Sequence, residues 1–191
     1  ALDPGDEDAA TGAGALSADG RRVAMGTADG RVLVWQVDGD DPELLLDEQL
    51  DLGVLNHVLL TDDASTVIAF SRDGHIRVLG LDGTDRGTVL GEHEMVGNTQ
   101  GGGVGGDGLL AVSDTSPAVE LLDLSDPGVV LSSIRPGADA YGVDFSPDGG
   151  LLALSLADNR IVLYDVSDPT SPVPVGDPLT GPSTVPNSVK F

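Results

Sequence analysis

The sequence has no cysteine, few basic residues, few aromatic residues and no long apolar run. The absence of cysteine excludes a disulfide framework and any site built on thiolates. No segment approaches the roughly 20 apolar residues that a membrane helix needs, so we expect no membrane insertion. The missing cysteines leave the compartment open, and we favour the cytoplasm over an extracytoplasmic location.

The scarcity of basic residues leaves a strongly acidic chain. Nine Lys and Arg residues stand against 32 Asp and Glu residues, which gives a formal net charge of −23. A surface this negative repels phosphate backbones, so we expect no direct binding of nucleic acid. Basic peptides or basic protein surfaces would be attracted instead. Solubility alone also explains such a charge, and both interpretations stay open.

Turn-forming residues are abundant. The chain has 27 Gly, 12 Pro, and 26 Asp against only 6 Glu, which indicates frequent chain reversals and argues against long helices. Four segments follow one order: apolar run, Asp-containing turn, apolar run, tight turn, apolar run. The residues that close the first run of successive repeats are separated by 44, 44, 41 and 46 residues; they are Leu16, Leu60, Val104, Phe145 and Phe191. An Asp follows three residues later in the four completed repeats.

The apolar runs are short and rich in Val, Ile and Leu, which favours strands over helices. A weaker fourth run completes the first three repeats at Glu43–Leu50, Arg86–Leu90 and Val129–Ile134, as expected of an outer edge strand. Four antiparallel strands in about 40–45 residues make one blade of a β-propeller. The sequence therefore predicts an all-β fold of about four blades.

The repeat also sets the expected domain boundaries. Residues 1–13 are interpreted as a flexible or inter-blade segment. The predicted blades and the first strand of a further blade are 14–55, 56–99, 100–139, 140–184 and 185–191. A propeller closes its last blade on its first, so we expect this chain to belong to a ring of six to eight blades. A compact four-blade ring, or two chains that close one ring, stays an alternative. An arc left open would expose apolar edges and could self-associate.

The fourth repeat carries a family resemblance. Phe145-Ser-Pro-Asp-Gly, Leu151-Leu-Ala-Leu-Ser and Arg160-Ile-Val-Leu-Tyr-Asp-Val together resemble a bacterial WD repeat. Asp177-Pro-Leu-Thr-Gly followed by Asn187-Ser-Val-Lys-Phe resembles the junction between consecutive blades of that family. The resemblance implies a β-propeller that binds other proteins, often accompanied in bacteria by kinase or signalling-NTPase domains.

The repeats depart from the family pattern in three places. Only Trp35 keeps the tryptophan, the Trp-Asp dipeptide is never intact, and the Gly-His dipeptide is missing. The buried His–Ser/Thr–Asp–Trp network of the family is therefore complete in no repeat. The stretch from Ile161 to Pro169 is also similar to the LVIVD-type repeats of bacterial surface proteins, so a distant propeller family stays an alternative.

One set of equivalent positions is the candidate binding site. Four residues before each marker stand Asn56, Gln100, Tyr141 and Asn187, with Gly12 in the first repeat. These positions begin the inner strands, beside the loops at one face of the blades. In WD-type propellers this rim resembles the usual protein-binding face. Polar side chains that cap strand entries would give the same pattern.

Other candidate sites have simpler explanations. His57, His75 and His93 match no local zinc motif, and we interpret His75 and His93 as surface residues in or near turns. The Gly101–Gly108 run has no following helix to receive a phosphate, so we interpret it as an inner strand with close backbone approach. Trp35 is expected to pack between blades. Asp clusters such as 38–41 fit no calcium loop, and no metal or other cofactor is predicted.

Two classes of function follow. The first is a non-catalytic scaffold or sensor that binds a protein or peptide. The alternative is a propeller enzyme, a lactonase-like or other hydrolase, with its site in the central channel. The sequence singles out no catalytic residue, so we predict the first.

Overall fold

The computed structural model describes residues 11–106, 108–181, 184 and 188–191. Its strands form four antiparallel four-stranded sheets, and in each sheet the strands follow one another in chain order. Within the described residues the only helical element is a single 3-10 turn at Gly83–Asp85. The predicted all-β fold of four-stranded blades is confirmed. In this part of the chain no helix is long and apolar enough to cross a membrane.

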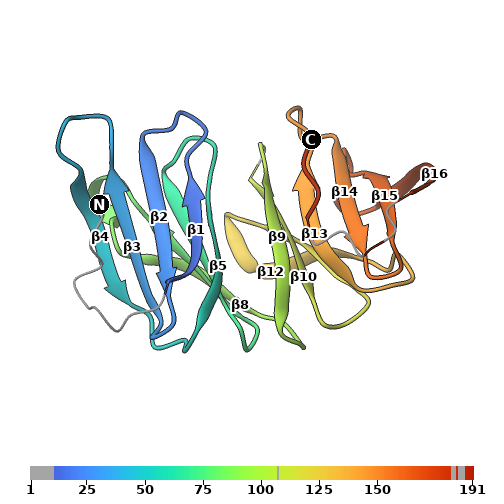
Figure 1. Cartoon of the computed structure of the whole chain (residues 1–191), viewed down its shortest axis with the longest axis horizontal. Coiled ribbons are helices and arrows are strands. Elements are labelled where there is room, and N and C mark those ends of the chain that lie inside the picture. The colour runs from blue at the N-terminus through green and yellow to red at the C-terminus, as the bar shows by residue number, and fades with distance from the viewer. Residues whose placement is uncertain (1–10, 107, 182–183, 185–187) are drawn as a thin grey trace. The chain divides into compact units, whose positions relative to one another are not determined.

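The four sheets divide between two compact units, residues 1–94 and 95–191 (Figure 1). In the first unit, one blade consists of β1 (Thr11–Leu16), β2 (Arg22–Thr27), β3 (Arg31–Gln36) and β4 (Glu43–Gln49). The next consists of β5 (Leu55–Leu60), β6 (Thr66–Ser71), β7 (His75–Gly80) and β8 (Val89–Glu94).

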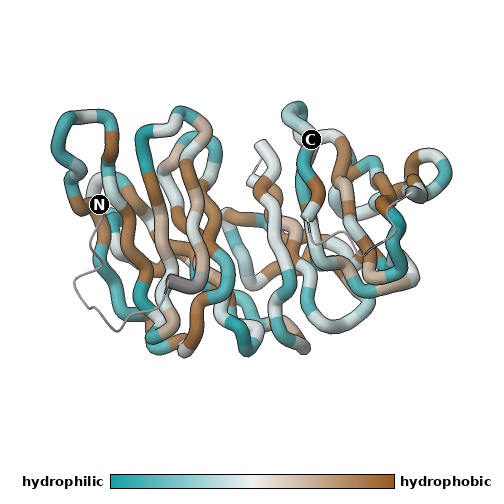
Figure 2. The backbone as a smooth tube through the Cα atoms, viewed as in Figure 1, coloured by the Kyte–Doolittle hydropathy of each residue, from teal (hydrophilic) through white to brown (hydrophobic). Residues whose placement is uncertain are grey.

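In the second unit, the first blade consists of β9 (Thr99–Gly105), β10 (Leu109–Asp114), β11 (Val119–Asp123) and β12 (Asp126–Ile134). The last consists of β13 (Ala140–Phe145), β14 (Leu151–Leu156), β15 (Arg160–Asp165) and β16 (Val173–Thr180). Figure 2 shows hydrophobic residues along the strands of both units and hydrophilic residues in the loop that joins β3 to β4.

Each unit has an apolar core between its two blades. In the first unit, Val32 and Val34 of β3 pack with Val67 and Ala69 of β6 and with Leu55 of β5. Alternate residues of a strand point to opposite faces of its sheet, so one face of each blade supplies this cluster. In the second unit an equivalent cluster joins the two sheets; its members include Leu121, Phe145, Leu152, Leu154 and Leu156.

Close approach of neighbouring inner strands explains the glycines of β9. A Cβ atom at Gly101 would lie 2.9 Å from the Tyr141 carbonyl oxygen, and one at Gly103 would lie 3.2 Å from that of Val143. A Cβ atom at Gly105 would lie 3.1 Å from the Phe145 ring. The glycine-rich run is therefore an inner strand pressed against its neighbour β13, as predicted.

A short hydrogen-bonded motif recurs in five of the turns. A Ser or Thr hydroxyl donates to the Asp two residues later, and the carboxylate or the hydroxyl also accepts a backbone N–H from beyond the turn. The motif recurs at Ser17–Asp19, Thr27–Asp29, Thr61–Asp63, Ser71–Asp73 and Ser146–Asp148. Residues with positive φ complete the turns as predicted, among them Gly30 (φ 89°), Gly149 (φ 74°) and Asn159 (φ 68°). This motif explains why Asp is so much commoner than Glu, because only the shorter side chain reaches back to its own turn.

Several boundaries differ from those expected. β1 begins at Thr11, inside the segment 1–13 for which no strand was predicted, while β5 and β9 begin one residue before the expected blade starts. β8 spans Val89–Glu94 rather than Arg86–Leu90, because residues 83–88 form a 3-10 turn and a short connection. The largest shift is therefore at the outer strand β8, and the inner strands β5 and β9 shift by one residue only.

The end of the chain lies against β13. Lys190 Nζ donates to Asp144 Oδ1 at 2.7 Å, and the Phe191 backbone N–H donates to Asp144 Oδ2 at 2.8 Å (Figure 1). The described residues of 185–191 are not assigned to a strand. That this segment begins a further blade stays a prediction.

Candidate functional site

The candidate rim positions coincide with a recurring irregularity of the inner strands. In all four blades, the register between the inner strand and its neighbour skips one residue near the start of the inner strand. The skipped residues are Gly12, Asn56, Gln100 and Tyr141. Such a β-bulge adds a residue on one strand only, and this alters the direction of the side chain it carries. The spacing of the repeats predicted that these positions are equivalent, but it did not predict the bulges.

Backbone hydrogen bonds hold the chain just before three of the four bulges. In three blades the residue after the second strand donates its N–H to a carbonyl that precedes the inner strand. These bonds are Arg72 to Val54 at 2.8 Å, Thr115 to Asn98 at 2.9 Å, and Ala157 to Asp139 at 2.9 Å. The backbone that leads into these bulges is therefore held in place by hydrogen bonds.

The structure brings Gln100 and Tyr141 together. They begin the adjacent strands β9 and β13 of the second unit, whose backbones approach closely at Gly101 and Tyr141. Gln100 is exposed and Tyr141 is partly exposed. Neither the Gln100 amide nor the Tyr141 hydroxyl has a hydrogen-bond partner among the described residues, so both can bind a ligand.

The other two predicted rim residues lie elsewhere. Asn56 is partly buried in β5 of the first unit. Asn187 lies outside the described residues. The role of all four residues in binding stays a prediction.

An exposed valine beside Gln100 was not predicted. Val96, in the loop before β9, exposes 96% of its surface. The next residue, Gly97, donates its N–H to the buried carboxylate of Asp114 at 2.8 Å, and Asn98 donates its N–H to Thr115 Oγ1 at 3.2 Å. A side chain at Gly97 would collide with Thr115. The loop is thus fixed with the Val96 side chain in solvent.

The histidines take structural positions. The His57 ring packs edge-on against Phe70, with ring centroids 5.5 Å apart. His75 begins β7 beside a turn, as expected, whereas His93 lies within β8 rather than near a turn. In the part of the chain that the structure describes, no group of three His, Asp or Glu side chains could hold a metal ion.

Trp35 is buried, with 5% of its surface exposed, but it does not join the core between the two blades of its unit. Val32 and Val34 occupy that core. Trp35 alternates with Val34 along β3, so it lies on the opposite face of the sheet. The expected burial is correct, and packing of Trp35 between blades stays a prediction.

Comparison with solved structures identifies the fold. The chain is similar to Sqt1 from Chaetomium thermophilum, with 21% identity and a TM-score of 0.74 over 90% of this chain and 46% of Sqt1. It is equally similar to C. thermophilum Sqt1 bound to the N-terminus of the ribosomal protein L10, with 21% identity and a TM-score of 0.74 over 90% of this chain and 49% of that one. This chain thus spans about half the length of the structures it matches. No family model and no curated protein matches the sequence.

Proposed function

We propose that this chain is part of a non-catalytic WD-repeat-like propeller that binds a protein or peptide on the face marked by the inner-strand bulges. The fold is that of β-propeller blades, and the carrying observation is the bulge itself. Four blades interrupt their pairing at the same residue, and in the second unit this presents Gln100 and Tyr141 with unused polar groups. Val96 adds an exposed apolar contact at the same end of that unit.

Tyr141 is the proposed anchor of the partner. Its ring offers apolar area, its hydroxyl is available for a hydrogen bond, and aromatic residues are enriched among interface hot spots. The similarity to Sqt1, whose solved complex holds the N-terminus of a ribosomal protein, supports a peptide-like ligand. The net charge of −23 favours a basic partner and disfavours nucleic acid.

We also propose that the four blades belong to a ring of six to eight blades within a longer protein, and that a signalling domain is attached to this ring. Sequencing the complete reading frame tests both statements. Hydrolase activity of the full-length protein that a channel carboxylate substitution abolishes would instead support the enzyme alternative.

The binding face is tested by affinity measurement. A partner captured from the source organism is titrated against the wild-type chain, Tyr141→Ala, Tyr141→Phe and Val96→Ser. We expect Tyr141→Ala to weaken binding by about 1–3 kcal/mol and Tyr141→Phe by less, since the ring is retained. Val129→Ser is the matched control, because Val129 is a 44% exposed valine of β12 in the same unit. Equal affinity of Tyr141→Ala and wild type would remove Tyr141 from the interface.

A further inference from the structure

Asp114 is the only charged residue that is buried among the residues the structure describes, with 1% of its surface exposed. Burial of a carboxylate costs free energy unless several donors satisfy its oxygens. Oδ1 accepts the Ser116 N–H at 2.7 Å and also the Ser116 hydroxyl, and Oδ2 accepts the Gly97 N–H at 2.8 Å. The carboxylate therefore joins the turn after β10 to the loop before β9.

The equivalent position of the other three blades has no carboxylate. In each blade this position pairs with the residue just before the bulge, which identifies the counterparts of Asp114 as Thr27, Ser71 and Leu156. The Thr27 and Ser71 hydroxyls donate to an Asp two residues later, whereas Asp114 accepts from a Ser two residues later. The order of the turn motif is thus reversed in this one blade.

The turn alone does not require this reversal. Thr27 and Ser71 build the corresponding turns with a hydroxyl, which costs less to bury than a carboxylate. What the carboxylate adds is a second oxygen, and that oxygen bonds Gly97, 17 residues earlier in the chain. The reversal therefore serves the loop before β9 and not the turn.

The loop that Asp114 holds leads directly into the start of β9. Met95 is buried at the beginning of the loop, with 5% of its surface exposed. Asn98 donates its N–H to Thr115 Oγ1 at 3.2 Å, and its carbonyl oxygen accepts the Thr115 N–H at 2.9 Å. Gln100, the bulged residue of β9, follows two residues later. A change in this loop therefore moves the backbone that carries Gln100.

We propose that Asp114 is the positioning residue of the bulged face, the end of the second unit at which Gln100 and Tyr141 begin their strands. Its carboxylate fixes the loop before β9, and the loop presents Gln100 beside Tyr141 in one arrangement. A partner then binds without having to order this loop, which reduces the loss of conformational freedom on binding. The inference rests on the binding function proposed above, and the buried Asp114 acts only through the loop.

The loop is tested in the free 191-residue chain by amide hydrogen exchange followed by NMR. Asp114→Asn keeps the shape of the side chain but has one acceptor oxygen in place of two, so Ser116 and Gly97 can no longer bond separate oxygens. We expect the Gly97 amide to exchange at least about tenfold faster in this variant than in wild type, the effect of losing a hydrogen bond to a charged group. Equal exchange of Gly97 in both chains would overturn the proposal, whether or not a partner is known.

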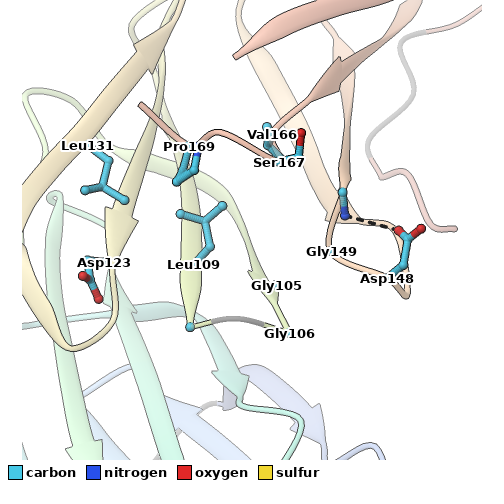
Figure 3. Close-up of a pocket in the computed structure, with 12 residues that line it drawn as sticks. Gly105, Gly106, Leu109, Asp123, Leu131, Asp148, Gly149, Val166, Ser167 and Pro169 are labelled. Carbon is cyan, nitrogen blue, oxygen red and sulfur yellow. Dashed lines mark hydrogen bonds between the residues drawn. The ribbon is translucent and has the colours of Figure 1, made fainter. Parts of the chain in front are cut away.

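Asp148→Asn is the matched control for the loss of charge. Asp148 lies beyond the opposite end of β13, and its Oδ1 accepts hydrogen bonds from Ser146 and Gly150 of its own turn (Figure 3). The variant removes one negative charge from the same unit without touching the loop before β9. It should leave the exchange of Gly97 unchanged.

Gly97→Ala is a second variant, which leaves the buried carboxylate in place and decides the question if Asp114→Asn does not fold. A Cβ atom at Gly97 would collide with the Thr115 hydroxyl oxygen, so the loop must shift while Asp114 keeps its bonds to Ser116. The Asn98 amide, which donates to Thr115, should then exchange faster. Unchanged exchange of Asn98 in this variant would also overturn the proposal.

The effect on binding is measured with the partner used for the Tyr141 titrations. Asp114→Asn and Gly97→Ala should each weaken binding about three- to tenfold, the loss expected when one or two more side chains are ordered on binding, and Asp148→Asn should not. Faster exchange in the loop with unchanged affinity would overturn the positioning role and leave the binding face intact. Equal affinity of Tyr141→Ala and wild type would instead count against the proposed face and not against the fixed loop.

Discussion

Gly30 is expected to be the most sensitive turn position of the first blade, for two reasons that can be separated. Its φ of 89° is one that residues with a Cβ adopt at a cost of roughly 1–2 kcal/mol. A Cβ atom at Gly30 would also lie 2.8 Å from the Gly53 carbonyl oxygen, in the connection to the next blade. Gly20 provides the matched control: its φ is 70°, and nothing lies within 4 Å of its Cβ position.

Gly20→Ala therefore measures the free-energy cost of a positive φ alone. Gly30→Ala measures that cost together with the cost of the collision with Gly53. We expect Gly20→Ala to cost about 1 kcal/mol, because reduced freedom of the unfolded chain offsets part of the strain. Gly30→Ala should cost about 2–3 kcal/mol, and Gly30→Val at least as much. Urea unfolding followed by the fluorescence of Trp35, the only tryptophan, reports on the same blade. Equal midpoints for the two alanine variants would refute the proposed collision.

Three further predictions concern a buried hydroxyl pair, the acidic turns and the outer edge. Ser113 Oγ donates to the Gly101 carbonyl oxygen at 3.3 Å, whereas the equivalent buried hydroxyl of Ser155 has no partner among the described residues. Ser113→Ala should therefore lower the unfolding free energy by about 0.5–1.5 kcal/mol, and Ser155→Ala should leave it unchanged or raise it, as urea titration would show. The hydrogen bonds of Asp63 and Asp73 lower the pKa values of these carboxyl groups in the folded chain. Their contribution to stability is therefore complete above the ordinary carboxyl pKa of about 3.9 and disappears as pH falls through the folded pKa values. The urea midpoint should change little from pH 7 to 5 and decrease below pH 4, and a midpoint that increases down to pH 3 would contradict this. The edge strand β16 exposes Val173, Val175 and Leu179, so the chain should self-associate as its concentration rises. Val173→Lys/Val175→Lys should shift the chain toward monomer in light scattering. A wild-type chain that stays monomeric at every concentration would exclude self-association through β16.

Most strands could be predicted because each is bounded by residues with a specific turn role. The Asp-Gly pairs at 29–30 and 148–149 mark positions that need positive φ, and the apolar runs between such pairs are too short for helices. The partner of each turn aspartate was also visible in the sequence, because a Ser or Thr stands two residues earlier, as in Ser17-Ala-Asp19. The predicted turns included the aspartates and not these hydroxyl partners.

The details of the candidate site could not be predicted in the same way. A bulge at Tyr141 depends on the register between two strands, and the sequence of one strand does not determine it. The exposure of Val96 depends on hydrogen bonds from its loop to Asp114 and Thr115, which follow β9 and lie in the next strand and turn. For Trp35, a period of two predicts burial on one face but does not say which face meets the neighbouring blade.

The turn motif changes what the acidity of this protein means. If Asp is selected because its short side chain accepts hydrogen bonds within its own turn, the net charge of −23 follows from building many turns and is weak evidence for a basic partner. Asp19 and Asp148 show this use of the carboxylate most plainly. They lie in different units, and each accepts the hydroxyl of the Ser two residues earlier through Oδ1, so the same turn is built by the same bond in both places.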